Sequence, residues 1–415
     1  FVKKAPTFRW IIFVIIYVIF SIYTLQALKT ASRFPWIYYI FIGISLIVLS
    51  NFIFQFTWGD DTGRVLNRPK SYAFGFLIAL ITFNIITIFF LFSEDIFRFI
   101  SGAYQKFYGA EKQFSLPERR RFLSLLALGI AALPFGALLY GMYKGKYNFK
   151  VLKYTMEYED LPSSFDGYQI TQISDVHSGS FDDRKKISYA IDLINKQKSD
   201  VLFFTGDMVN NKTEEMLPWA ELFSKLEAKD GKYSILGNHD YGDYITWDTE
   251  EEKLENLENL KVLQKEMGFD LLLNENRYLK KGVDKLALIG VENWGRGGFK
   301  KAGDLKKAAI GIQADDFKIL LSHDPSHWED VVIYDDYHYH LTLSGHTHGM
   351  QFGIEIPGWV KWSPVKWRYK YWAGIYEELG QFINVNRGFG FIGYPGRVGI
   401  WPEITVITLK RKDLT

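Results

Sequence analysis

Four long uncharged stretches in the first third of the chain constrain its fold more than any other feature. They cover residues 10–28, 34–59, 71–93 and 122–143. Each matches or exceeds the about 18–20 apolar residues that a helix needs to cross the hydrocarbon core of a bilayer. Trp10, Trp36 and Trp58 stand near their ends, where tryptophan concentrates in membrane proteins. We therefore predict a transmembrane region of four helices over residues 1–143.

These stretches contain no Asp, Glu, Lys, Arg or His, so no proton relay or ion pathway is visible in them. An even number of spans places both ends of the region on one side of the membrane. The run Arg119-Arg120-Arg121 precedes the fourth stretch and is either a twin-arginine-like export signal or a basic cytoplasmic flank. Both interpretations put the rest of the chain outside. We expect an integral, multi-pass inner-membrane protein whose C-terminal domain lies on the periplasmic face.

The composition changes after residue 143. Residues 144–160 are expected to form a basic linker and residues 161–415 a second domain. The whole chain has 49 Lys and Arg against 47 Asp and Glu, so it shows no basic footprint for nucleic acid. The absence of cysteine excludes disulfides and thiolate metal sites.

The second domain reads as alternating strands and helices. Short apolar runs at 168–174, 201–205 and 232–236 are separated by helical patterns at 184–198 and 214–226, which is a βαβαβ order. Further strands are expected at 277–281, 286–291, 317–321, 340–343, 381–385 and 403–409. We predict an α/β sandwich of two sheets with helices outside.

Five short polar motifs each follow one of these expected strands. They are Asp175-Val176-His177, Gly206-Asp207, Gly237-Asn238-His239-Asp240, His323 and Gly345-His346-Thr347-His348. Ligands of open α/β sheets collect at the carboxyl ends of strands. In an extended strand end, residues two apart leave the same face, and the glycines permit sharp turns. Carboxylate, imidazole and amide groups without sulfur suit Mn, Fe, Zn or Mg, so we predict a site for two divalent metals.

Residues 168–410 resemble calcineurin-like metallophosphoesterases, whose pattern is D-x-H, G-D, G-N-H-D, H and G-H-x-H. The stretches at 345–349 and 385–390 are similar to a membrane-bound or exported bacterial branch that includes UDP-diacylglucosamine pyrophosphatases. The resemblance implies an α/β/β/α metallophosphoesterase sandwich. It also implies two divalent ions, for which we expect manganese, with Fe, Zn or Mg as alternatives.

The same resemblance implies a role for each motif residue. One metal would be held by Asp175, His177 and His348, the other by Asn238, His323 and His346, and Asp207 would bridge them. A hydroxide between the metals would attack phosphorus, and His239 would protonate the leaving oxygen. One position departs from the family, because Asn210 replaces an aspartate that orients the acid histidine in relatives. Asn210 and Arg387 are candidates either for supporting the metal ligands from outside or for contacting substrate.

Two other segments are open to more than one interpretation. The stretch 358–372 interleaves cations with aromatic residues, and it is either a surface hairpin or a membrane-interface patch. The candidate interface residues are Trp359, Trp362, Trp367 and Trp372. The insertion at 248–267 is expected to be a solvated helix, with a substrate lid as the alternative.

These observations favour a membrane-anchored phosphoesterase with a dinuclear metal centre. Its expected partners are membrane lipids and a phosphorylated, lipid-linked substrate carrying a phosphoester or pyrophosphate bond. A tethered phosphodiesterase for soluble nucleotides is the alternative enzyme. A catalytically silent, metal-dependent binding or scaffold protein is the alternative from another class.

Overall fold

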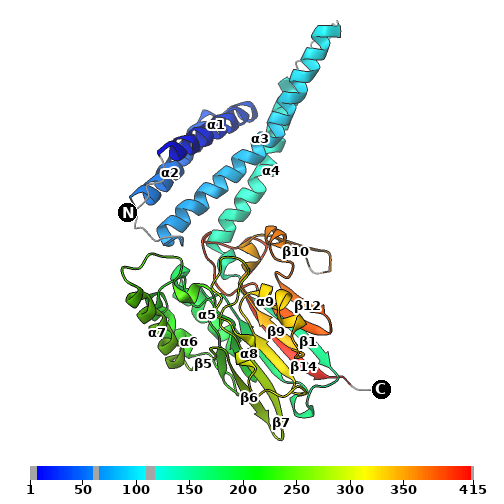
Figure 1. The fold of residues 1–415 in the computed structure, drawn as a ribbon. Helices are drawn as coiled ribbons and strands as arrows, with labels where there is room; N and C mark the ends of the chain where they lie inside the picture. Colours follow the sequence, from blue (N-terminus) through cyan, green and yellow to red (C-terminus); the bar gives the residue numbers. More distant parts are fainter. Residues whose placement is uncertain (1–6, 59–64, 109–116, 357, 413–415) are drawn as a thin grey trace. The chain divides into compact units, whose positions relative to one another are not determined.

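The computed structural model describes residues 7–58, 65–108, 117–356 and 358–412 (Figure 1). Its chain divides into two compact units. One unit comprises Phe1–Asp60 and Pro69–Met142, and the other comprises Asp61–Arg68 and Tyr143–Thr415.

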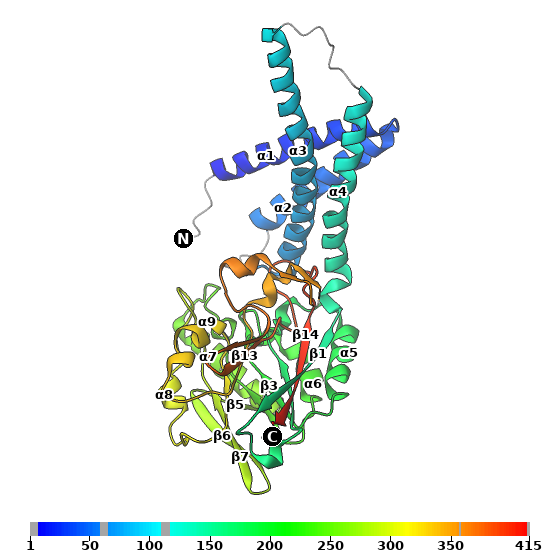
Figure 2. The ribbon, with the colours of Figure 1, turned by 90° about the vertical axis from the view of Figure 1, so that its right-hand side faces the viewer.

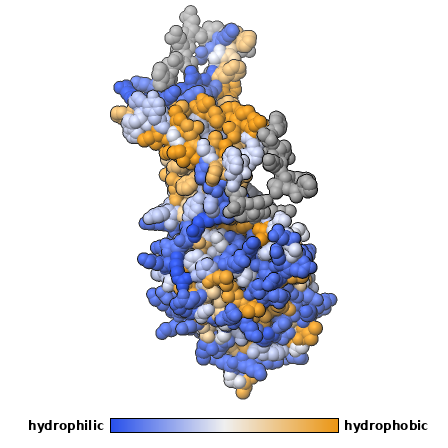
Figure 3. Space-filling model, turned by 90° about the vertical axis from the view of Figure 1, so that its left-hand side faces the viewer, coloured by the Kyte–Doolittle hydropathy of each residue, from blue (hydrophilic) through white to orange (hydrophobic). Residues whose placement is uncertain are grey.

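The first unit consists of the helices α1 (Thr7–Ala31), α2 (Pro35–Thr57), α3 (Arg68–Tyr108) and α4 (Pro117–Tyr143). The first residue of α3, Arg68, and the last residue of α4, Tyr143, are assigned to the second unit. All four are long and apolar enough to span a membrane, which agrees with the four expected spans. The end of the second expected span, Gly59, lies outside the described residues. Hydrophobic side chains dominate the surface of the helices in Figure 3, whereas hydrophilic side chains dominate the other unit in that view.

Helix α3 is much longer than the expected span at 71–93. Its 41 residues extend for about 60 Å at 1.5 Å per residue, about twice what a bilayer core requires. The helix continues past Ser93 because the charges that follow are paired. Nη1 of Arg120 on α4 contacts the carboxylates of both Glu94 and Asp95, the former at 3.2 Å. Arg120 is therefore engaged with α3 within this unit.

The second unit contains two six-stranded sheets. The first has the order β1-β14-β2-β3-β4-β5, and the second has the order β12-β13-β9-β8-β7-β6. Strands β2 to β5 run parallel, as do β13, β9, β8 and β7. The strands of the first sheet are β1 (Lys150–Tyr158), β2 (Gln169–Ile173), β3 (Val201–Phe204), β4 (Lys232–Ser234), β5 (Phe269–Leu271) and β14 (Glu403–Arg411). Those of the second are β6 (Glu275–Lys281), β7 (Asp284–Gly290), β8 (Lys318–Leu321), β9 (Leu341–Ser344), β12 (Gly374–Glu378) and β13 (Gln381–Val385).

The sheets pack face to face, with helices on both outer faces. Strand β3 shows why: Val201 and Phe203 belong to the core between the sheets, and Leu202 and Phe204 face the helices. Its four residues are all buried, which explains the continuous apolar run in the sequence. The covering helices are α5 (Arg184–Asn195), α6 (Leu217–Ser224) and α7 (Glu250–Glu266) on one side and α8 (Leu305–Ala308) and α9 (Pro325–Asp330) on the other. In Figure 2, α5 and α6 lie to the right of the strands, and α8 and α9 lie to the left. The expected α/β/β/α sandwich is confirmed.

Two expectations about segments need correction. Residues 150–158 were expected in a linker, but they form β1, which pairs with β14 at the edge of the first sheet. The insertion at 248–267 contains α7, whose Leu260 and Leu263 are buried in the core cluster beneath the first sheet. A helix packed in this way covers the sheet, so the lid interpretation is wrong.

Candidate metal centre

The metal motifs meet where the carboxyl ends of the two sheets come together. The loops after β2, β3 and β4 carry the motifs of the first sheet, and those after β8 and β9 carry the motifs of the second. A polar contact joins the sheets just below these loops. Nε2 of Gln172 on β2 donates to the carbonyl of Ser344 on β9 at 2.9 Å, and Nδ2 of Asn384 donates to Oε1 of Gln172 at 2.7 Å. The sandwich therefore fixes ligand loops from both sheets around one point.

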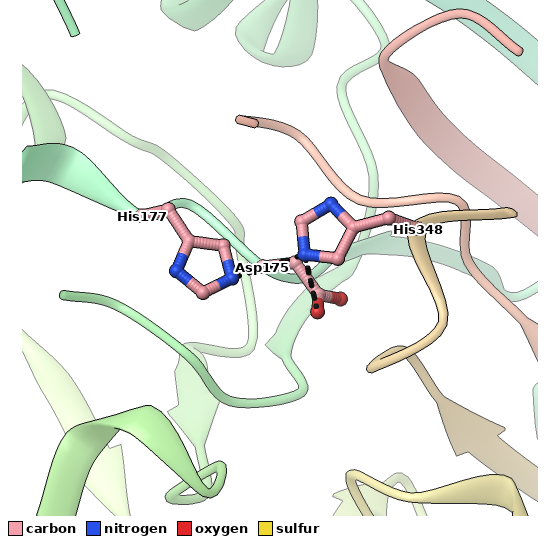
Figure 4. Close-up of side chains that lie close together, drawn as sticks. All are labelled: Asp175, His177 and His348. Atoms are coloured by element: carbon pink, nitrogen blue, oxygen red, sulfur yellow. Dashed lines mark hydrogen bonds and ion pairs between the residues drawn. The ribbon is translucent and has the colours of Figure 1, made fainter. Parts of the chain in front are cut away.

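The first group of ligands consists of Asp175, His177 and His348, which converge in Figure 4. The Nε2 atoms of the two histidines are 3.0 Å apart, and Nε2 of His348 is 3.2 Å from Oδ1 of Asp175. Two ligand atoms bound to one ion at about 2.0–2.2 Å are separated by about 3 Å when they are roughly perpendicular. The spacing therefore suits one shared cation.

The second group consists of Asp207, His323 and His346, with Asn238 beside them. Nε2 of His323 lies 3.2 Å from Oδ2 of Asp207, and Nδ1 of His346 lies 2.7 Å from Oδ1 of Asn238. Oδ2 of Asp207 is also 3.6 Å from Nε2 of His177 in the first group. Asp207 thus lies between the two groups, in the position that a bridging ligand requires.

The backbone at the ligands is strained. Ten described residues other than glycine have a positive φ, and five of them are ligands: Asp175, His177, Asp207, His346 and His348. Such conformations cost on the order of 1–3 kcal/mol each and concentrate at functional sites. The expectation that Asp175 and His177 leave one face of an extended strand end is therefore wrong, because both lie beyond β2 in left-handed backbone.

Two motif glycines are required by close packing at the centre. A Cβ at Gly345 would lie 1.9 Å from Oγ of Ser174 and 2.2 Å from Oδ2 of Asp175. A Cβ at Gly206, where φ is +93°, would lie 2.6 Å from the backbone nitrogen of Gly237. Any side chain at either position would displace a ligand loop.

The ionisable ligands are buried, and the charge of each one shifts the pKa of its neighbours. Burial by itself would raise the pKa of Asp207, but the adjacent His323 and His239 outweigh it and hold that pKa well below its usual value. Burial opposes a charge on His323, yet the carboxylate of Asp207 raises its pKa to about 10. Burial lowers the pKa of His177 and of His346, so these imidazoles are neutral lone-pair donors near pH 7. The carboxylates, His177 and His346 thus have the protonation states that divalent cations bind, whereas His323 would have to release a proton when a cation binds.

His239 lies close to His177 and Asp207, and its orientation is set in an unexpected way. Its Nδ1 is 2.9 Å from the backbone carbonyl of Asn210, which is an acceptor only, so Nδ1 carries the proton and donates. The Asn210 side chain instead bonds to Oγ of Ser180, at 3.1 Å from Nδ2. The main chain at position 210 therefore fixes the tautomer of His239, whatever the side chain is.

Two further residues of the same loop support these ligands. The ring of Tyr244 packs against His239 at 4.4 Å, and its hydroxyl accepts a hydrogen bond of 2.7 Å from Nδ2 of Asn238. Asp240 is fully buried and accepts from the backbone N–H groups of Asp207, Met208 and Gly237. Asp240 could be suspected from its place in the G-N-H-D motif, whereas the contact of Tyr244 had no signal in the sequence.

His346 and His348 are held on their outer sides by residues that are not themselves proposed ligands. Nε2 of His346 is 2.8 Å from the hydroxyl of Tyr369 and 3.4 Å from Oδ2 of Asp324, a buried oxygen with no hydrogen bond of its own. Nη2 of the buried Arg397 is 3.1 Å from Nδ1 of His348. Such outer contacts orient metal ligands. Asp324 adjoins a motif, but Tyr369 and Arg397 lie 23 and 49 residues from their partners.

Two predicted assignments need correction. Arg387 is buried, and its guanidinium donates hydrogen bonds to Glu355, at 2.5 and 2.9 Å, and to Glu403, at 2.5 Å. It is a structural residue rather than a free contact for substrate. Trp372 is buried in a small core cluster and cannot belong to an exposed patch, whereas Trp359 and Trp367 are 79% and 75% exposed.

Comparison with known proteins agrees with this geometry. Residues 168–350 match the family described as "Calcineurin-like phosphoesterase", and residues 8–146 match "Probable Calcineurin-like phosphoesterase, transmembrane domain". The uncharacterized metallophosphoesterase YkuE of Bacillus subtilis is 31% identical over 301 residues, which cover 70% of this chain and 97% of YkuE. The chain belongs to the calcineurin-like phosphoesterase family. It is a metal-dependent phosphoester hydrolase and a multi-pass membrane protein.

Two further proteins are similar to this chain. A "Transmembrane protein with metallophosphoesterase domain" of Danio rerio is 27% identical, over 71% of this chain and 63% of its own length. The solved structure of a 5'-nucleotidase precursor from Thermus thermophilus is 12% identical with a TM-score of 0.35, covering 59% of this chain and 54% of that one.

The residues present fit the divalent ions that this family implies. The buried Nε2 of His323 makes no hydrogen bond although it faces Asp207. Oxygen and imidazole donors without sulfur match hard or borderline cations. The chain would thus hold one ion with Asp175, His177 and His348 and a second with Asn238, His323 and His346, with Asp207 shared.

Proposed function

We propose that this phosphoesterase hydrolyses a phosphoester or pyrophosphate bond of a lipid-linked substrate at a dinuclear centre. The observation that carries the dinuclear part is the position of Asp207, which lies within 3.6 Å of ligand nitrogens from both groups. The lipid part rests on the four apolar helices, since a single helix would be enough to tether a soluble enzyme.

The ions, when bound, would polarise the phosphoryl oxygens and make water a stronger nucleophile at neutral pH. The chain itself supplies the remaining steps. Its buried carboxylates and imidazoles fix the positions of the reacting groups, and the strained ligand loops keep those positions rigid. Binding of the phosphate would align the scissile bond with His239.

His239 is the residue proposed to protonate the leaving oxygen. Its Nδ1 is committed to the Asn210 carbonyl, so Nε2 is the nitrogen that exchanges a proton with substrate. Burial lowers its pKa from the ordinary value, so Nε2 is largely unprotonated in the free protein near pH 7 and must take up a proton before it can give one to the leaving oxygen. The intact His239 distinguishes this site from that of a silent binding or scaffold protein.

The location follows from the sequence argument. We propose that the protein lies in the inner membrane, with Arg119–Arg121 in the cytoplasm and the metal centre on the outer face. The substrate would then be a lipid-linked phosphate or pyrophosphate that is accessible from that side. Manganese is the proposed native metal, because mixed carboxylate, imidazole and amide ligands accommodate it well.

A substrate panel tests this proposal. Full-length protein in lipid nanodiscs with Mn²⁺ is given a lipid pyrophosphate, a phospholipid and a soluble nucleotide, and products are identified by mass. We expect the lipid-linked substrate to turn over fastest and turnover to depend on its presence in the bilayer. Faster hydrolysis of the nucleotide would instead support the tethered nucleotide phosphodiesterase. No hydrolysis of any substrate by metal-loaded protein would support the scaffold alternative.

A further inference from the structure

The hairpin that follows the last metal ligand has its apolar side turned away from the protein. Strands β10 (Ile354–Ile356) and β11 (Val360–Trp362) form a two-stranded sheet separate from the two large sheets. Their register pairs Ile354 with Trp362 and Ile356 with Val360, so these four side chains share one face. The other face carries the pair Glu355 and Lys361.

The polar face of this hairpin is the one attached to the body of the domain. Glu355 binds the buried Arg387, which also binds the buried Glu403 of β14. Nζ of Lys361 donates to the carbonyl of Ala373 and lies 3.2 Å from the hydroxyl of Tyr376. A hairpin on a water-soluble surface shows the reverse arrangement, with its apolar face toward the core. By binding Glu355, Arg387 thus holds the hairpin with the side chains of Ile354 and Ile356 turned outward.

Exposed apolar side chains are concentrated in this region. In the described residues 150–412, fourteen large apolar side chains are exposed, and six of them lie within residues 350–367. Ile354 and Ile356 are 54% and 43% exposed, and Trp359 stands at the tip of the hairpin. Trp362 packs edge-on against the exposed Trp367 at 6.1 Å. We call this surface the apolar face; it comprises Met350, Phe352, Ile354, Ile356, Trp359 and Trp367.

We propose that the apolar face docks the catalytic domain onto the lipid bilayer in which the protein is anchored. This inference rests on the proposed function, because it supplies the route by which a lipid phosphate would meet the metal centre. Isoleucine, phenylalanine and two exposed tryptophans are the side chains that enter the headgroup region, and tryptophan prefers that depth. Lys366 and Arg368 border the face and are exposed, so their charges can meet lipid phosphates.

The apolar face is linked to the metal centre at both of its ends. Met350 follows the ligand His348 by two residues in the chain. At the other end Tyr369, two residues after Trp367, contacts Nε2 of the ligand His346 at 2.8 Å. The guanidinium of Arg368 lies over the ring of Phe299, 5.1 Å from its centre, and that ring packs edge-on against His346 at 4.8 Å. A lipid phosphate arriving at this face would meet Arg368 next to the second metal group.

Site-directed spin labelling tests the docking directly, since the chain has no cysteine and each introduced cysteine is unique. Labels are placed singly by Ile354→Cys, Ile356→Cys and Trp359→Cys in the full-length protein. Matched controls are Val283→Cys and Ile310→Cys, which are 99% and 72% exposed and lie outside the face. The proteins are reconstituted into nanodiscs of phosphatidylcholine and phosphatidylglycerol. Collision of each label with oxygen and with a water-soluble nickel complex is then measured by EPR.

Docking predicts that the three hairpin labels have an oxygen-to-nickel accessibility ratio several-fold above that of the two controls. Hairpin labels that are as accessible to nickel as the controls would overturn the proposal. Labels shielded from both reagents would also overturn it, because they would indicate a protein partner or a second copy of the chain. Repeating the measurement with Asp207→Ala separates this inference from the proposed function, since docking requires no catalysis.

Discussion

In two histidines of the candidate metal centre, contacts at one ring nitrogen determine which nitrogen faces the site. Nδ1 of His239 is held by the carbonyl of Asn210, and Nε2 of His346 is held by Tyr369 and Asp324. His346 consequently presents Nδ1 to Asn238 and to the proposed second metal position, while His239 presents Nε2. Residues that contact no substrate therefore determine how the ligands and the proposed acid are oriented.

Replacing His239 separates chemistry from metal binding. His239→Ala should lower kcat by roughly 10²–10⁴ for a substrate with a poor leaving group, because protonation of that group is lost. An activated aryl phosphodiester, whose leaving group needs little protonation, should be affected much less. Steady-state kinetics on both substrates, with metal content measured in parallel, checks this. Equal losses on the two substrates would assign His239 a different role.

Asn210→Ala is the matched control for that experiment. The backbone carbonyl orients His239, and among the described residues the amide side chain bonds to Ser180 alone, so this variant should retain most of the activity. A loss as large as that of His239→Ala would show that the amide itself is required.

At the scale of elements, the sequence was most informative about residues that belong to short motifs directly after a strand. The motifs after β2, β3, β4, β8 and β9 revealed all seven proposed ligands, because strand ends bring them together in any sheet of this topology. The roles of Tyr369, Arg397 and Arg387 could not be inferred, because they depend on contacts across the fold. Arg387 appeared available to substrate in the sequence, yet Glu355 and Glu403 occupy its guanidinium.

The ion pairs of Arg387 predict a large effect on stability. Arg387→Ala would leave the carboxylate of Glu403 buried without its partner, which should cost about 3–5 kcal/mol. The thermal midpoint of the full-length variant in detergent should fall clearly below that of the parent. Arg368→Ala, which removes an exposed arginine from the neighbouring segment, should leave the midpoint almost unchanged. An Arg387→Ala protein with the parent's midpoint but a raised KM would restore Arg387 as a substrate contact.

The whole molecule joins four apolar helices to a phosphoesterase domain. The long α3 and its charge pairs with Arg120 show that the helical unit is more than a set of minimal spans.

With an even number of spans and Arg119–Arg121 in the cytoplasm, the catalytic domain should be outside. An alkaline-phosphatase fusion after Thr415 should then be active, and a cytoplasmic reporter at the same point should be inactive. The opposite pattern would place the centre in the cytoplasm and shift its substrates to that side.

The central claim is that one shared carboxylate, Asp207, joins two metal positions, and the metal content of the purified protein tests it most directly. After equilibration with Mn²⁺ and removal of the free ion, the wild type should contain two ions per chain. His323→Ala, which removes one ligand of the second group only, should reduce the content toward one, and Asp207→Ala should reduce both content and activity further. Circular dichroism would confirm that the variants are folded. A wild type that binds a single ion, or an Asp207→Ala protein that keeps two ions and full activity, would contradict the account.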